Sequence, residues 1–114
     1  MKYKLLQIQL TDAEVDQVNA TGHNSVPKQK ARLGMDFADD IGVNAGKAFD
    51  AKYYDHVSNI VADDLNGVFH IGNMGPEENI ERLGRMSSVS VGDIIEDEDG
   101  VRNVVDIAGF AEVV

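Results

Sequence analysis

Residues 87–113 combine a strand-like alternation of apolar and polar side chains with one strong turn signal. Val89 and Val91 fall on one face of the first run, and the return run alternates in the same way after the turn. The dipeptide Asp99-Gly100 between the runs is typical of a two-residue hairpin turn. The pattern therefore predicts a C-terminal β-hairpin over residues 87–113, on which the rest of the chain folds.

The remaining segments predict two further strands and three or four short helices. The first residues and residues 53–61 favour strands, because β-branched and aromatic side chains alternate there. Thr11 and Glu14 have the spacing of a capping box, which predicts a helix over 12–19. Three further helices are predicted. The first begins at Pro27 and ends at Gly42, and the second has an acidic N-cap at 62–64 and ends at 72–73. The third begins at Gly75-Pro76 and continues to Leu83.

These elements predict a single α+β domain over residues 1–114. The sheet is expected to be antiparallel, to include the hairpin and the 53–61 strand, and to carry the short helices on one side. A chain of 114 residues with 43% hydrophobic residues can bury a small core. Because cysteine is absent, disulfides and thiolate metal sites are excluded. The polar first ten residues and the lack of a long apolar run predict no membrane segment and a location in the cytoplasm, that of the host cell if a phage encodes the protein.

The charge of the chain is unevenly distributed. The net charge is −10, and residues 58–114 hold 12 of the 20 acidic but only 3 of the 10 basic side chains. Carboxylates repel phosphates, so direct nucleic-acid binding is not expected. An acidic surface suits solubility, and it also suits docking on a basic protein partner or imitation of nucleic acid.

Two segments are candidate binding sites. The first is the acidic hairpin tip, made of Glu96, Asp97, Glu98 and Asp99. The second is a basic helix start with a neighbouring histidine, made of His23, Lys28, Lys30 and Arg32. Positive charge at a helix N-terminus opposes the helix dipole, so helix stability does not explain these residues. An anion or partner contact is an alternative to simple surface solubility.

Other motifs do not predict a cofactor or metal site. The 42–48 segment resembles a phosphate-binding loop but is one residue short and lacks the hydroxyl after its lysine. The acidic 93–100 segment lacks the ligand spacing of a calcium-binding hand. The three histidines have no metal-ligand spacing, and Ser88, Ser90 and Asp93 have no nucleophile-elbow context. Gly92-Asp93 more simply predicts a bend or bulge in a strand.

The second half of the chain resembles a group of small, largely uncharacterised proteins of phages, prophages and plasmids. The resemblance rests on the block 86–95 and the later Gly109-Phe110, which match an "S.SVGD … GF" motif. Upstream positions that match in order are Tyr54, Val57, Asp64, Leu65, Val68, Phe69 and Asn73. The resemblance implies a mobile-element context for the chain and carries over no catalytic residue.

The sequence is therefore compatible with three functions. The first is a non-enzymatic accessory protein of a phage or mobile element that binds a macromolecule through its acidic half. The second is a small enzyme or ligand-binding domain that uses the His23/Lys28/Lys30/Arg32 region. The third is a structural or oligomeric component.

Overall fold

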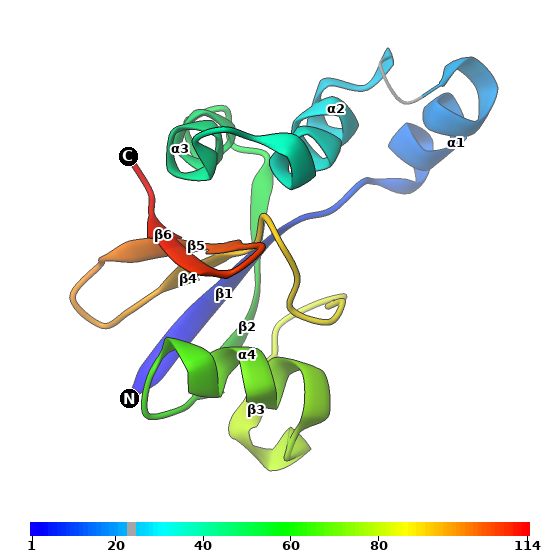
Figure 1. The fold of residues 1–114 in the computed structure, drawn as a ribbon. Coiled ribbons are helices and arrows are strands. Elements are labelled where there is room, and N and C mark those ends of the chain that lie inside the picture. The colour runs from blue at the N-terminus through cyan, green and yellow to red at the C-terminus, as the bar shows by residue number, and fades with distance from the viewer. Residues whose placement is uncertain (23–24) are drawn as a thin grey trace.

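The computed structural model describes residues 1–22 and 25–114, with only the backbone of Phe37. It contains a six-stranded antiparallel sheet in the order β3-β2-β1-β4-β5-β6 (Figure 1). The strands are β1 (Lys2–Ile8), β2 (Tyr54–Val61), β3 (Ile80–Arg82), β4 (Ile94–Glu96), β5 (Arg102–Asp106) and β6 (Gly109–Glu112). The helices are α1 (Asp12–Thr21), α2 (Pro27–Gly34), α3 (Ile41–Asp50) and α4 (Leu65–Met74), with 3₁₀ turns η2 (Met35–Phe37) and η3 (Glu77–Asn79). The predicted α+β class is confirmed.

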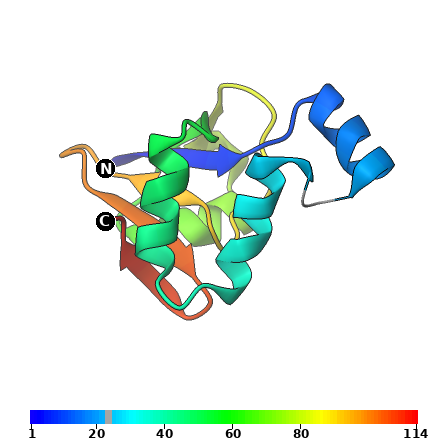
Figure 2. The same cartoon turned by 90° about the horizontal axis from the view of Figure 1, so that it is seen from above.

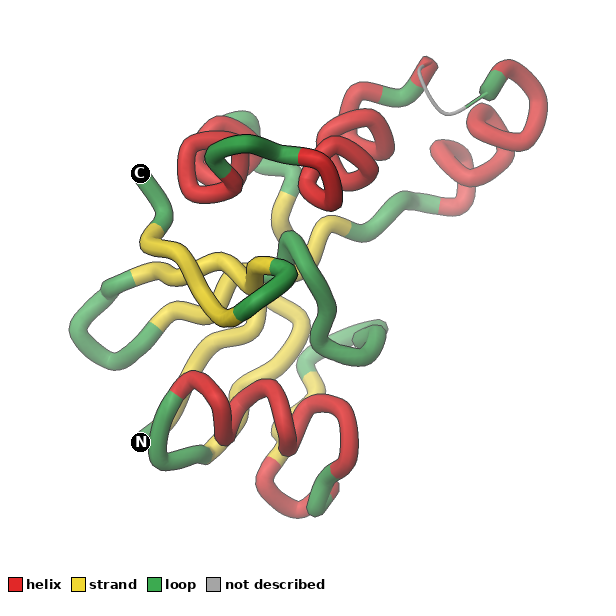
Figure 3. Tube along the Cα trace, in the orientation of Figure 1, coloured by secondary structure: helices red, strands yellow, loops and turns green. Residues whose placement is uncertain are grey.

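Helices pack on both faces of the sheet, which corrects the prediction of helices on one side only. Neighbouring residues in the strands belong to different core clusters: Ile95 and Val105 pack beneath α4, whereas Ile94 and Val104 pack beneath α3. Because successive side chains of a strand point to opposite faces, these apolar pairs require cover on both sides. Figure 3 shows the resulting helical layers above and below the sheet.

Strand β1 lies near the centre of the sheet and pairs with β2 and β4. Its register with β2 shifts between Leu5 and Leu6, where Val57 is the extra residue of a β-bulge. Leu5 packs in the core on the α4 side, and Leu6 packs on the α3 side. The central strand thus joins the two halves of the core.

The predicted starts of helices were correct where a capping side chain sets the first turn. Thr11 and Glu14 form the predicted capping box at the start of α1, and Asp64 caps α4 through the Gly67 amide. The predicted stop at Gly42 is wrong, because α2 ends at Gly34 and Gly42 lies in the first turn of α3. A Cβ atom at Gly42 would lie 2.3 Å from the Glu112 carbonyl oxygen, so this glycine allows β6 to approach α3 closely.

The predicted hairpin over 87–113 is only partly correct. A turn is present at Asp99-Gly100, with Gly100 at a φ of +82°, but it is part of a connection over residues 97–101 and not a two-residue turn. Strand β4 is limited to three residues. A second turn at 107–108 divides the return run into β5 and β6. The predicted helix through Ile80 and Leu83 is also wrong. Ile80 begins the edge strand β3, which pairs with β2.

Helix α1 stands away from the body of the molecule in two perpendicular views (Figures 1 and 2). It has no buried residue, and its Val15 is 39% exposed. Its contacts with α2 and the segment just before it are polar: Glu14 pairs with Lys28, and the Gln17 amide donates to the Ser25 carbonyl. Helix α1 is therefore held by hydrogen bonds and an ion pair and contributes little to the core.

Candidate functional site

One end of the sheet gathers acidic residues from two distant parts of the chain. Strand β1 begins at this end, and β2 and β4 end there, because both pair with β1 in antiparallel register. The turn after β2 carries Asp63 and Asp64, and the turn after β4 carries residues 97–99. We call this set the acidic end; its members are Asp63, Asp64, Asp97, Glu98 and Asp99.

The Tyr3 side chain lies close enough to both turns for their carboxylates to affect its pKa. Its pKa is raised, first by desolvation and then by the negative charges of Asp64, Asp97, Glu98 and Asp63. A carboxylate raises the pKa of a neighbouring phenol because it opposes a second negative charge. No member of the acidic end takes part in the ion pairs found among the described residues. The acidic end therefore presents negative charge that the chain itself does not neutralise.

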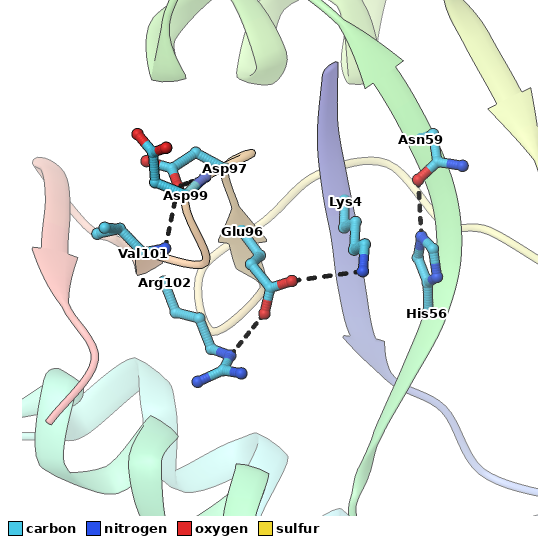
Figure 4. Close-up of polar contacts among 8 residues, drawn as sticks. All are labelled: Lys4, His56, Asn59, Glu96, Asp97, Asp99, Val101 and Arg102. Atoms are coloured by element: carbon cyan, nitrogen blue, oxygen red, sulfur yellow. Dashed lines mark hydrogen bonds and ion pairs between the residues drawn. The ribbon is translucent and has the colours of Figure 1, made fainter. Parts of the chain in front are cut away.

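The four predicted tip residues have different environments, and Figure 4 shows three of them, Glu96, Asp97 and Asp99. Glu96 is a structural residue: its side chain is 14% exposed and pairs with Arg102 at 2.7 Å and Lys4 at 3.6 Å. Asp97 caps the turn, since its Oδ1 accepts hydrogen bonds from the amides of Asp99 and Val101. Glu98 and Asp99 are exposed. The geometry therefore leaves Glu98 and Asp99 as the tip carboxylates most available to a partner.

A polar cleft of about 320 Å³ adjoins the acidic end on the half of the sheet that α3 leaves uncovered. Lys4 and His56 line it, together with the carboxylates of Glu96 and Glu98. His56 Nε2 lies 2.9 Å from Asn59 Oδ1, as Figure 4 shows. The cleft offers both charges and hydrogen-bonding groups, which suits recognition of a polar protein surface.

The predicted basic site does not assemble into one cluster. Lys28 pairs with Glu14 at 3.0 Å and donates to the Gln9 carbonyl at 2.9 Å. Lys30 lines a groove between α2 and α3, whereas Arg32 lines a different and much smaller pocket. Lys30 is two residues from both Lys28 and Arg32 and therefore points in nearly the opposite direction. Lys28 lies on the same face as Arg32 but is held by Glu14 and the Gln9 carbonyl. His23 lies outside the described residues.

The groove between α2 and α3 was not predicted from the sequence. It measures about 460 Å³, and its lining is largely apolar, with Ala31, Met35 and Tyr53 among its residues. Lys30 and Lys47 also line it, one from each helix. The signal in the sequence was the run of small and apolar residues over 43–50, which forms most of α3.

A buried hydrogen-bonded cluster holds the loop before β4 and was also missed. The Gln7 amide donates to Asp93 Oδ2 at 3.0 Å, and the Ser90 amide donates to the same oxygen at 3.0 Å. The Tyr54 hydroxyl donates to the Gly92 carbonyl. Burial raises the pKa of Asp93 to about 6 against the lowering effects of these hydrogen bonds and of Arg32. Gly92 has a φ of +94°, so the predicted bend at Gly92-Asp93 is present.

The Asp93 cluster has little room for a ligand. The pocket beside it measures about 20 Å³, which is enough for roughly one water molecule. The Asp93 carboxylate accepts hydrogen bonds that hold the loop against β1, so we assign it a structural role. The available sequence signal was Gln7, a polar residue within an otherwise apolar strand segment.

Comparison of the chain with protein-family models, curated proteins and solved structures gives no match. Among the described residues, no three histidine, aspartate or glutamate side chains form a set that could hold a metal ion. The helices in the described part of the chain are too short or too polar to cross a membrane. The function has to be inferred from the geometry of the acidic end and its surroundings.

Proposed function

We propose that the protein is a non-enzymatic accessory protein of a phage or mobile element that docks on a basic surface of another protein through its acidic end. The observation that supports this proposal is that the turns after β2 and β4 lie at the same end of the sheet, where Asp63, Asp64, Asp97 and Glu98 all raise the pKa of Tyr3. Five carboxylates that take part in no ion pair of residues 1–22 and 25–114 suit a surface rich in lysine and arginine. The mobile-element context is the one implied by the resemblance of the second half of the chain.

The class of partner follows from the charge pattern. A protein that binds nucleic acid carries a basic surface complementary to closely spaced phosphates. Carboxylates at the acidic end can occupy such a surface in place of phosphates. The proposal therefore favours a nucleic-acid-binding protein as partner and disfavours direct binding of DNA or RNA by this chain.

The proposal is tested by affinity capture with two matched charge variants. The first combines Asp63→Asn, Glu98→Gln and Asp99→Asn, and spares Asp64 and Asp97 because they cap α4 and the turn. The control combines Asp36→Asn, Asp39→Asn and Asp50→Asn, three exposed acids elsewhere on the surface. Both variants lose three negative charges, so they separate the effect of position from that of net charge.

We expect the wild-type chain and the control to retain basic proteins from a cell lysate at about 50 mM salt and to lose them at high salt. The acidic-end variant should retain them about tenfold less, since each exposed charge pair contributes up to ~1 kcal/mol. Equal capture by the two variants, or capture of acidic proteins that resist high salt, contradicts the proposal.

A further inference from the structure

Helix α1 has a negatively charged face whose side chains are exposed in the part of the chain that the structure describes. Glu14, Gln17 and Thr21 face α2 and the segment before it, through an ion pair with Lys28 and hydrogen bonds to Ser25. At 100° per residue, the opposite face carries Asp12, Val15, Asp16 and Asn19, all of them exposed. Asp12 and Asp16 lie four residues apart in one row of this face, with Val15 at its edge, and neither carboxylate is in an ion pair among the described residues.

The groove between α2 and α3 has the complementary character. Its lining combines apolar side chains such as Met35 and Tyr53 with the two lysines, Lys30 and Lys47, and includes no carboxylate among the described residues. Both lysines are exposed, and neither takes part in the ion pairs of residues 1–22 and 25–114. A short helix with a row of carboxylates beside an apolar residue would place its negative charges against these ammonium groups and its apolar residue against the groove floor.

We infer that the α2–α3 groove receives helix α1 of a second copy of this chain. The complementary charge of the two surfaces supports this occupant: Asp12 and Asp16 meet Lys30 and Lys47, and Val15 packs on the apolar floor. The outward position of α1 in Figures 1 and 2 leaves it available to another molecule. A two-fold arrangement lets both copies exchange helices at once, as in other self-complementary dimers. This inference uses neither the acidic end nor the partner of the proposed function.

The dimer is expected to be weak. A ten-residue helix that buries one valine gives an interface below the standard size, so we expect a dissociation constant on the order of 100 µM. The charge pairs then contribute a large share of the affinity. Self-association should accordingly weaken as the salt concentration rises.

Sedimentation of the full chain from about 10 µM to 1 mM tests the inference, with charge reversal on each side of the contact. Lys47→Glu and Asp16→Lys should each weaken self-association about fivefold or more, because an attraction becomes a repulsion. The double variant Asp16→Lys/Lys47→Glu should recover most of the loss, since the two charges are exchanged. Glu78→Lys, an exposed reversal in η3, which adjoins β3 and is part of neither surface, should leave self-association unchanged.

Circular dichroism of each variant checks that the fold is retained, as expected for substitutions at exposed positions. A wild-type chain that stays monomeric up to 1 mM overturns the inference. Self-association that neither single reversal weakens, or that the double variant does not recover, also overturns it. Because Asp63, Glu98 and Asp99 are unchanged in these variants, a failure here leaves the capture experiment on the acidic end unaffected.

Discussion

The side-chain amide of Gln7 on β1 donates a hydrogen bond to the Asp93 carboxylate at 3.0 Å, eighty-six residues along the chain. Gln7 Oε1 in turn accepts from the Ser87 amide at 3.0 Å. These bonds fasten the irregular loop before β4 to the central strand. Because Asp93 is buried and its pKa is raised to about 6, the cluster links the stability of the fold to pH.

Asp93 is predicted to make the protein less stable as the pH rises from about 4 to about 6. The folded state holds a proton that the unfolded chain, with an ordinary pKa of 3.8, has already released. The effect amounts to up to about 3 kcal/mol and is complete above pH 6. Asp93→Asn should remove this slope, as measured by urea unfolding at several pH values.

The comparison of wild type with Asp93→Asn isolates this group from carboxylates whose pKa is lowered, such as Glu14, for which stability is lost as the pH falls. Asp93→Ala is the second control. It leaves the Gln7 and Ser90 donors without their acceptor and should cost about 1–3 kcal/mol at any pH. An unchanged pH profile in Asp93→Asn would show that the buried carboxyl does not control it.

Gly42→Ala is predicted to destabilise the protein by about 1–3 kcal/mol, because the new methyl group would meet the Glu112 carbonyl oxygen at 2.3 Å and force β6 away from α3. Gly34→Ala is the matched control in α2, where no atom lies within 4 Å of the new Cβ. That substitution should be neutral or stabilise by up to ~1 kcal/mol. Equal effects of the two substitutions on the urea midpoint would contradict the close approach of β6.

Glu96→Gln is predicted to lower the free energy of unfolding by roughly 1 kcal/mol, because it weakens the pairs with Lys4 and Arg102. The Arg102 guanidinium also stacks 4.1 Å from the centroid of the Phe49 ring, so this carboxylate helps to hold a cation–π contact. Glu98→Gln, two residues away and exposed, should change stability by less than ~0.5 kcal/mol. Thermal unfolding of the two variants distinguishes Glu96, which stabilises the fold, from the exposed Glu98.

Thr11→Ala is predicted to unwind α1 without lowering the melting temperature of the rest of the domain. The substitution removes a capping box worth about 1 kcal/mol, but α1 buries no residue. Asp64→Ala removes the equivalent cap of α4, whose Val68 is fully buried, and should lower the melting temperature. Amide exchange over residues 12–21 and calorimetry provide the two readouts. A similar loss of melting temperature in both variants would mean that α1 is part of the cooperative core.

The sequence was informative wherever neighbouring residues decide the structure. The Thr11–Glu14 box, the Asp99-Gly100 turn and the 53–61 strand were all predicted from local chemistry and are present. The stop at Gly42 was wrong because the reason for that glycine is Glu112, seventy residues away. Ile80 was assigned to a helix because its pairing with Ile60 on β2 is not visible in the local pattern.

The candidate site depends even more on the order of the strands. The hairpin tip was predicted as a binding segment, but the addition of Asp63 and Asp64 requires β2 and β4 to flank β1. Conversely, Lys28, Lys30 and Arg32 look like one cluster in the sequence, but the helix directs Lys30 away from the other two, and Lys28 pairs with Glu14. Binding by the tip and the identity of a partner remain predictions.

The most direct test of the acidic end is an NMR titration of the ¹⁵N-labelled chain with a basic protein recovered by affinity capture. We predict that the largest amide shifts fall in residues 62–66 and 97–101, and that they shrink when salt is added or when Asp63, Glu98 and Asp99 are neutralised. Shifts centred on the α2–α3 groove or on β3, with the acidic end unaffected, would contradict the proposed function.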